Sequence, residues 1–211
     1  MFIELIHWIS DKLLDNPHMF NSVRYLLAGK QMGMKKFVAS NLNKYNCGII
    51  ADFCCGTGDF AISSPFNSRY YGWDLNSDFI KYAEKKYHQD KNKKFLKGNV
   101  LNSETIYRKK FDAVLLISAM HHLSDKELSV LLPKIKKISK KILIIADIIP
   151  DPPHFLQKFF VKIDRGRYIR PKAEKLRILR NYFKIVSSEL IPTKSAIQFG
   201  IVCEVTSVKK S

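Results

Sequence analysis

The spacing of apolar residues changes once along this chain, near residue 48. Before that point apolar side chains recur every three or four residues, which is the spacing of one face of a helix. Asn16 and Pro17 suit the cap and first position of a helix, and Gly29 suits a helix end. We read residues 1–45 as an N-terminal helical lid or extension; the alternatives are helices packed on their own domain or lying on a membrane surface. The predicted helices span residues 2–13, 17–28 and 32–45.

Beyond residue 48, short apolar runs alternate with amphipathic segments, a pattern typical of parallel strands joined by helices. The apolar runs are 48–53, 70–73, 94–97, 111–117 and 141–148, and the helical stretches are 76–88, 124–139 and a short one after Gly58. Two further strands, 182–190 and 196–207, suggest a closing antiparallel pair. The pattern predicts one α/β domain over residues 46–211. Its sheet is doubly wound, mostly parallel and seven-stranded, with helices on both faces and an antiparallel strand near the C-terminus.

Composition narrows the class of protein. No apolar run among the 211 residues approaches the roughly 20 that span a bilayer, and no basic leader precedes the first apolar residues, so we expect neither a transmembrane protein nor a secretory signal. The four cysteines lack C-x-x-C spacing, which favours the reducing cytoplasm and no metal site. The net charge is +17, from 28 Lys and 8 Arg against 19 acidic residues, and five of the arginines fall within residues 165–180. Because arginine can bind a phosphate or carboxylate through two hydrogen bonds at once, this cluster indicates an anion-binding segment more specifically than the net charge does.

An apolar strand that runs into a turn of small residues gives the first candidate site. It reads Ile49-Ile50-Ala51-Asp52-Phe53-Cys54-Cys55-Gly56-Thr57-Gly58-Asp59. Ligands bind at the carboxyl ends of such strands. The turn does not match the dinucleotide fingerprint G-x-G-x-x-G, because Cys54 holds the first position and the third glycine is absent.

The stretch Asp52 to Gly58 resembles the first motif of the class I S-adenosylmethionine-dependent methyltransferases. Later motifs of that family follow in order over residues 48–150: Asp74 sixteen residues after Gly58, then Gly98-Asn99-Val100, Phe111-Asp112-Ala113-Val114 and Ser118-Ala119-Met120-His121-His122-Leu123. The resemblance implies a Rossmann-like methyltransferase domain over 46–211 and an enzyme of the small-molecule type. Its cofactor would be S-adenosyl-L-methionine.

The resemblance also implies roles for single residues. Gly56 and Gly58 would let the backbone approach the cofactor closely. The Asp74 carboxylate would accept hydrogen bonds from both ribose hydroxyls, and Asn99 with Val100 would bind adenine. Two positions depart from the family pattern: Cys54 replaces a glycine, which puts a side chain into a crowded turn, and Asn99 replaces the commoner aspartate. The expected cofactor-binding residues are Asp52, Cys54, Gly56, Gly58, Asp74, Leu75, Asn99, Val100 and Ser118.

His121 and His122 follow the fourth predicted strand and are the candidate catalytic bases for an acceptor that must lose a proton. The alternative for either one is a capping or packed histidine. In-line methyl transfer itself asks the protein mainly for positioning and exclusion of water.

The segment 155–184 interleaves aromatic residues with ten basic and two acidic ones. Its Arg165, Arg167, Tyr168 and Arg170 suit a small anionic acceptor with an apolar body. Residues 164–170 also resemble a stretch of quinone- and lipid-type methyltransferases of this superfamily, which implies a lipid- or quinone-like, membrane-associated acceptor met in the cytoplasm or at the membrane surface. They would equally suit RNA, so a tRNA or rRNA methyltransferase is the alternative, followed by a noncatalytic cofactor-binding partner subunit. A solvated helix face is the further alternative for Lys172, Lys175, Arg177 and Arg180.

Overall fold

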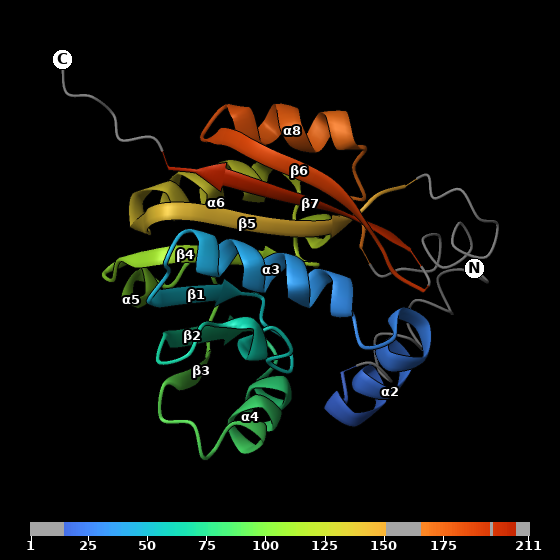
Figure 1. Ribbon diagram of the computed structural model, residues 1–211, viewed down its shortest axis with the longest axis vertical. Coiled ribbons are helices and arrows are strands. Elements are labelled where there is room, and N and C mark those ends of the chain that lie inside the picture. Colours follow the sequence, from blue (N-terminus) through green and yellow to red (C-terminus); the bar gives the residue numbers. More distant parts are fainter. Residues whose placement is uncertain (1–14, 151–165, 195, 206–211) are drawn as a thin grey trace.

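A computed structural model describes residues 15–150, 166–194 and 196–205 of the chain (Figure 1). Seven strands form one sheet in the order β3-β2-β1-β4-β5-β7-β6. Neighbouring strands are parallel except at β7, which is antiparallel to both β5 and β6. The predicted fold class is thereby confirmed, including the antiparallel strand near the C-terminus. The strands are β1 (Ile49–Phe53), β2 (Arg69–Asp74), β3 (Lys93–Lys97), β4 (Phe111–Ile117), β5 (Ser139–Ile148), β6 (Lys184–Pro192) and β7 (Ile197–Glu204).

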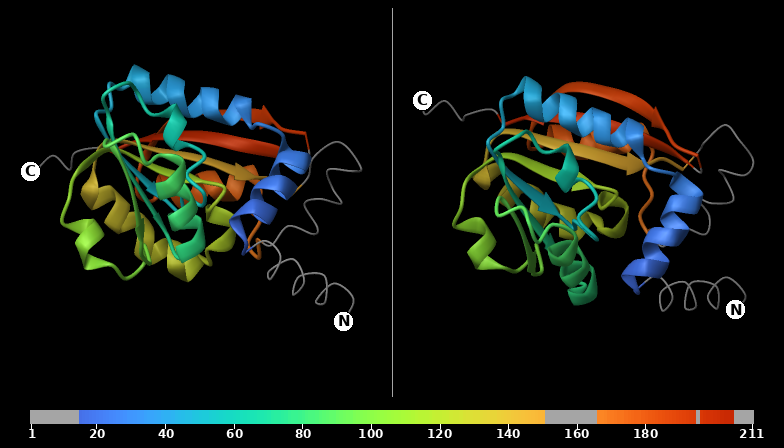
Figure 2. Two further views of the ribbon diagram at one scale, coloured as in Figure 1. Left: turned by 90° about the horizontal axis from the view of Figure 1, so that it is seen from below. Right: turned by 60° about the horizontal axis from the view of Figure 1, so that its bottom comes forward.

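Helices cover both faces of the sheet (Figures 1 and 2). They are α2 (Pro17–Ala28), α3 (Met32–Lys44), α4 (Ser77–Lys86), α5 (Glu104–Tyr107), α6 (Asp125–Ile138) and α8 (Lys172–Arg180), with short 3₁₀ turns η1 (Ala61–Ser63) and η2 (Met120–His122). Side chains of α3 and α4 share one core layer with the sheet, and those of α5, α6 and α8 share the other. None of the helices in the described part of the chain is long and apolar enough to cross a membrane.

The alternation of side chains along the central strands produces these two core layers. Ala51, Val114 and Leu143 lie in register on neighbouring strands and pack on the α6 side. The residues that precede them in the chain form the matching row on the α3 side: Ile50, Ala113 and Ile142. Because both faces of these strands are buried, their sequences are almost continuously apolar.

Local sequence signals set the helix starts. The side chain of Asn16 accepts hydrogen bonds from the amides of His18 and Met19 at 2.9 and 3.2 Å, which caps α2. Ser124 and Glu127 form a reciprocal capping box at the start of α6. The short helix expected after Gly58 is η1.

The helices of the predicted N-terminal extension take two different positions (Figure 2). α3 packs on the sheet, where Met34, Phe37, Val38 and Leu42 are buried. α2 instead lies at the carboxyl edge of the parallel strands, beside the loop that follows β1. The first predicted helix, residues 2–13, lies outside the described residues.

Candidate active site

The acidic residue at the end of β2 organises the loop that follows β1. Asp74 accepts a hydrogen bond from the Gly56 amide through Oδ2 at 2.8 Å and one from the Asn76 amide through Oδ1 at 2.9 Å. Burial raises the pKa of Asp74, and the backbone donors of Asn76 and Gly56 oppose that rise. Each carboxylate oxygen has two lone pairs, so the side chain retains acceptor capacity for a ligand.

The loop adopts left-handed backbone at alternate positions: Cys54 has φ 61°, Gly56 54° and Gly58 73°. At Gly58 a Cβ atom would stand 2.8 Å from Cε1 of Phe95, so only glycine fits. At Gly56 a Cβ would meet nothing within 4 Å, so this part of the loop borders open space. Cys54 holds the same kind of backbone without being glycine, which carries a steric cost. Burial raises the pKa of its thiol to about 12, so Cys54 is an uncharged thiol at neutral pH.

A cavity of about 90 Å³ lies between this loop and α2. Asp52, Cys54, Gly56 and Ser118 line it from the strand ends. Burial raises the pKa of Asp52 to about 7, although a hydrogen bond from the Tyr70 hydroxyl opposes that rise. The cavity therefore contains a carboxyl group that a neighbouring cation would readily ionise.

α2 closes this cavity through polar contacts. Asn21 accepts a hydrogen bond from the Thr57 hydroxyl at 2.9 Å, and Arg24 is ion-paired with Asp59. Arg24 also donates to Asn21 at 2.8 Å. Burial opposes ionisation of Asp59, but Arg24 together with Lys86 and Lys35 outweighs burial and lowers its pKa well below the usual range. The helix is thus attached to the loop mainly by a charged network rather than by a large apolar interface.

A second cavity, of about 670 Å³, shares Arg24 and Asp59 with the first. Lys30, Lys35 and Lys36 contribute cations to its lining. Apolar residues that line it, with large exposed fractions, are Tyr25, Met32 and Ile62. Its chemistry suits a ligand with an anionic group and an apolar body.

Five of the nine expected cofactor residues lie outside the lining of the smaller cavity: Gly58, Asp74, Leu75, Asn99 and Val100. Asn99 accepts a hydrogen bond from the Leu101 amide at 2.8 Å and so shapes the turn after β3, while Val100 is buried. Leu75 follows Asp74 directly and is 63% exposed. These residues follow β2 and β3, which are neighbours in the sheet, so they continue the site along its carboxyl edge.

The two candidate bases have different environments. His121 is buried, and its Nδ1 lies 2.5 Å from Oδ1 of Asp147. His122 is exposed, and its ring centre lies 4.1 Å from that of His121. Both are in η2, three and four residues after Ser118, which lines the smaller cavity. The sequence analysis did not single out Asp147 as a site residue. An acidic residue at the end of an apolar strand is the pattern by which it could have been found.

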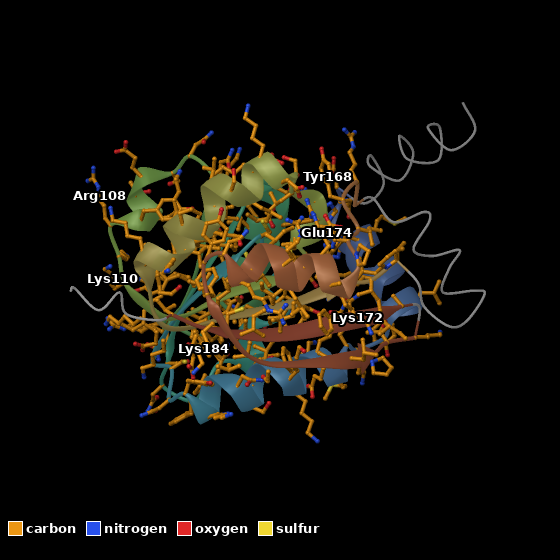
Figure 3. The ribbon with its side chains drawn as sticks, turned by 90° about the horizontal axis from the view of Figure 1, so that it is seen from above. Arg108, Lys110, Tyr168, Lys172, Glu174 and Lys184 are labelled. Atoms are coloured by element: carbon orange, nitrogen blue, oxygen red, sulfur yellow. The ribbon has the colours of Figure 1, made fainter. Side chains whose placement is uncertain are left out.

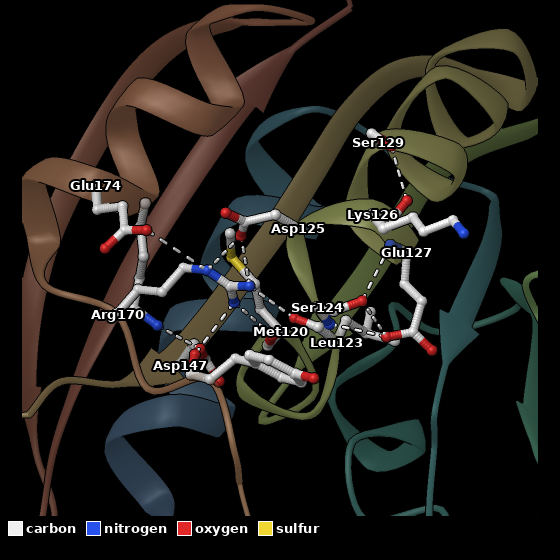
Figure 4. Close-up of polar contacts among 12 residues, drawn as sticks. Met120, Leu123, Ser124, Asp125, Lys126, Glu127, Ser129, Asp147, Arg170 and Glu174 are labelled. Atoms are coloured by element: carbon white, nitrogen blue, oxygen red, sulfur yellow. Dashed lines mark hydrogen bonds and ion pairs between the residues drawn. The ribbon is translucent and has the colours of Figure 1, made fainter.

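Arg170 is one of the expected substrate-binding residues, and the structure buries it (Figure 4). Its five N–H groups donate to the carbonyls of Met120, Leu123 and Tyr168 and to the carboxylate of Asp125, at distances of 2.7–3.1 Å. In this arrangement no N–H group of Arg170 is left for a substrate. Its contacts hold the loop between β4 and α6.

The remaining residues of that basic segment divide into exposed and buried ones. Arg167 and Tyr168 are exposed, and Arg165 lies outside the described residues. Lys172 and Lys184 are exposed near the two ends of α8 (Figure 3). Lys175 has no exposed surface, so a solvated helix face is wrong for this lysine. The sequence could not reveal this burial, because Asp147, whose carboxylate accepts a hydrogen bond from Lys175, lies on β5, 28 residues away.

Comparisons with known proteins agree with this geometry. Residues 50–141 match the family model of the methyltransferase domain. Among curated proteins the search finds no match. The match covers 92 of the 211 residues, so the central part of this chain is similar to methyltransferase domains.

Solved structures share the fold at low sequence identity. Magnesium protoporphyrin IX methyltransferase from Synechocystis PCC 6803, with bound S-adenosylhomocysteine, is 18% identical with a TM-score of 0.66, over 83% of this chain and 84% of that one. Human N-acetylserotonin methyltransferase is 15% identical with a TM-score of 0.64, over 83% of this chain and 52% of that one. An O-methyltransferase family protein from Burkholderia thailandensis is 13% identical with a TM-score of 0.72, over 92% of this chain and 60% of that one.

The side chains at the carboxyl edge fit the cofactor of this family. Asp74 retains acceptor capacity beside the glycine loop, and the open space at Gly56 admits a ligand close to the backbone. Asp52 supplies a carboxyl group that can balance a positive charge. In the described part of the chain no group of three or more His, Cys, Asp or Glu residues is placed to hold a metal ion.

Proposed function

We propose that this protein transfers a methyl group from S-adenosylmethionine to a small anionic or membrane-associated acceptor. The observation that carries the cofactor site is the contact of Asp74 with the Gly56 amide, which joins the acidic end of β2 to the glycine loop. Asp74 binds the ribose hydroxyls, Asn99 and Val100 bind adenine, and Asp52 faces the methionine ammonium. The cofactor, when bound, supplies an activated methyl group on a sulfonium. The protein orients the acceptor and excludes water.

α2 is the lid of this site. The cavity beneath it holds about 90 Å³, whereas pockets for small molecules and cofactors have volumes of about 300–1,000 Å³. Binding and release of the cofactor therefore require α2 to move, which separates Asn21 from Thr57 and Arg24 from Asp59. α3 is fixed in the core, so the moving part ends before Met32.

The larger cavity supports an anionic acceptor. Its lysines attract a phosphate or carboxylate, and its exposed apolar residues suit a hydrocarbon or ring system. The same combination supports contact with an anionic membrane surface, from which a lipid- or quinone-like acceptor would be taken. Where the acceptor must lose a proton, His121 or His122 accepts it.

The first experiment is calorimetric titration with S-adenosylmethionine and S-adenosylhomocysteine, followed by a screen of lipid, quinone and tRNA acceptors with labelled methyl. Micromolar cofactor binding and transfer to a lipid or quinone are expected. Transfer to tRNA with a strong salt dependence would favour the RNA alternative. Cofactor binding without transfer to any acceptor would favour a partner subunit, and a folded protein that binds neither compound would refute the proposal.

Sedimentation with vesicles tests the membrane contact separately. We expect binding to vesicles that contain phosphatidylglycerol and little binding to phosphatidylcholine alone, because the lysines of the larger cavity need an anionic surface. The Lys30→Glu/Lys36→Glu variant should lose this binding, whereas Lys94→Glu/Lys97→Glu makes the same charge change on β3. Equal loss in both variants would show that net charge alone attracts the protein.

A further inference from the structure

One carboxylate of the protein lines both cavities and is shared by three cations. Asp59 is ion-paired with Arg24, which also lines both cavities. Lys35 Nζ lies 3.5 Å from Oδ2 of Asp59, and Lys86 Nζ lies 3.1 Å from Oδ1. The three cations come from α2, α3 and α4. A single acidic residue thus brings positive charge from three helices to one place.

The larger cavity has more positive charge than Asp59 can balance. Lys30 and Lys36 add two further cations to its lining, and Asp59 is the only acidic residue among the described residues that line it. The first turn of α3, whose Met32 lines the cavity, has no acidic residue, so nothing in that turn offsets the positive end of the helix dipole. Such an excess of positive charge attracts an anion.

Two buried polar atoms at this cavity have no hydrogen-bond partner among the described residues. They are Nε of Arg24 and the hydroxyl of Ser63, and both residues line the cavity. Ser63 is 6% exposed. Buried polar groups are nearly always hydrogen-bonded, because an unpaired one reduces stability. An anionic ligand of the cavity would supply acceptors to both atoms.

Exposed apolar side chains in the same lining define the rest of the ligand. Tyr25, Met32 and Ile62 are 58%, 65% and 69% exposed. They suit an alkyl or aryl body that extends from the charged end of a ligand. For the charged end, a phosphate monoester fits better than a carboxylate. It offers three acceptor oxygens and about −1.5 to −2 charges at pH 7, and so satisfies more of the cations and unpartnered donors.

We propose that Asp59 stands in for the phosphate group of an amphiphilic methyl acceptor, and that this phosphate replaces the Asp59 carboxylate at Arg24 and Lys35. The inference rests on the proposed function, which places the acceptor in the larger cavity. Lys86 does not line that cavity and stays with Asp59. The charged end of the acceptor then lies at the residues that the two cavities share, and its apolar body lies on Tyr25 and Ile62.

Isothermal titration of the full-length protein with octyl phosphate at pH 7.5, below the micelle concentration, tests the site. Octyl glucoside is the control ligand, because it has the same alkyl chain and an uncharged head. We expect octyl phosphate to bind roughly 10- to 100-fold more tightly, as the gain from one charged hydrogen bond implies. Equal affinity for the two compounds would overturn the proposal.

Asp59→Asn tests the replacement itself. The variant removes the carboxylate that competes for Arg24 and Lys35, so octyl phosphate should bind about tenfold more tightly than to wild type. Asp78→Asn is the matched control, because it makes the same charge change at an exposed residue of α4. Unchanged or weaker binding by folded Asp59→Asn would overturn the proposal, and so would an equal gain in both variants, which would show an effect of net charge alone.

Two further variants test the site without altering Asp59. Lys35→Met should weaken binding of octyl phosphate roughly 10- to 100-fold, whereas Lys44→Met, at an exposed position in the last turn of the same helix, should not. Ser63→Ala should weaken binding without lowering the Tm, because the hydroxyl has no partner among the described residues. Binding within about threefold of wild type in both Lys35→Met and Ser63→Ala would overturn the proposal.

Titration of the same samples with S-adenosylhomocysteine separates this inference from the proposed function. Octyl phosphate binding with the expected variant effects, in a protein that binds no S-adenosylhomocysteine, would refute the proposed function and with it the identification of the ligand as a methyl acceptor. Binding of S-adenosylhomocysteine together with equal affinity for octyl phosphate and octyl glucoside would refute the inference and leave the cofactor site intact.

Discussion

Replacement of Asp74 by alanine removes the carboxylate that we assign to the ribose of the cofactor. A hydrogen bond to a charged acceptor contributes about 1.5–3 kcal/mol. Two ribose hydroxyls would therefore contribute about 3–6 kcal/mol, which corresponds to a dissociation constant raised roughly 10²- to 10⁴-fold. Starting from micromolar affinity, binding should fall beyond the range of calorimetry.

The same substitution also affects the loop. Asp74→Ala removes the acceptors of the Gly56 and Asn76 amides, at 2.8 and 2.9 Å in the wild type. Water can replace part of this loss because Asp74 is only half-buried. A net cost of about 1 kcal/mol for each bond is expected, or about 2 kcal/mol in total. At about 2–4 °C for each kcal/mol, the Tm should fall by roughly 4–8 °C.

The assay is isothermal titration with S-adenosylhomocysteine at 25 °C, together with thermal unfolding of the same samples. Asp78→Ala is the control, because it removes an equal charge from an exposed residue of α4 whose carboxylate contacts only Lys81, at 3.2 Å, among the ion pairs of the described residues. It should bind as wild type does. A folded Asp74→Ala protein that binds S-adenosylhomocysteine within threefold of wild type would refute the assignment of Asp74 to the ribose.

Three further predictions concern stability. Burial raises the folded-state pKa of Asp52 to about 7, against about 3.9 in an unfolded chain, so the folded protein holds an extra proton in that window and loses stability as the pH rises through it. Denaturant unfolding at pH 5 and 7.5 should show this loss of unfolding free energy, up to about 1.4 kcal/mol per pH unit, in wild type and not in Asp52→Asn. An equal change of unfolding free energy with pH in the two proteins would contradict the prediction. Gly58→Ala should lower the free energy of unfolding by roughly 2–4 kcal/mol, because it adds a collision with Phe95 to a strained φ of 73°. The control Gly29→Ala has a φ of 65° and no atom within 4 Å of the added Cβ, so it should lower that free energy by about 1 kcal/mol. Similar losses in the two variants would refute the collision. Ser124→Ala removes the capping box of α6 and should cost about 0.5–2 kcal/mol in chemical unfolding, and no measurable change would show that the cap is dispensable.

The periodicity of the sequence was sufficient to predict most of the secondary structure. The apolar runs correspond to β1 through β5, and the helical stretches 76–88 and 124–139 correspond to α4 and α6 within two residues at each end. These elements are predictable because their signals are local: a cap such as Asn16 acts within three residues, and alternation acts within one strand. The motif from Asp52 to Gly58 is likewise contiguous, so it could be found without a structure.

The sequence could not decide which amphipathic helix packs on the sheet and which lies at its carboxyl edge. α2 and α3 both have apolar residues at helical spacing, yet α3 packs on the sheet and α2 closes the carboxyl edge. The choice depends on which surface each helix meets. The Arg24–Asp59 pair, which attaches α2 to the loop, joins residues 35 positions apart.

Sequence by itself determined the strands, the helices and the glycine loop of this protein, because each depends on neighbours within one turn or one strand. Tertiary structure alone decided the surroundings of its buried charges. Arg170 looked like a substrate ligand and Lys175 like a surface residue, but the sheet brings Met120 and Asp147 against them from 50 and 28 residues away. The physical reason is that a charged side chain leaves water only where partners compensate for its lost hydration, and here those partners come from distant strands and loops.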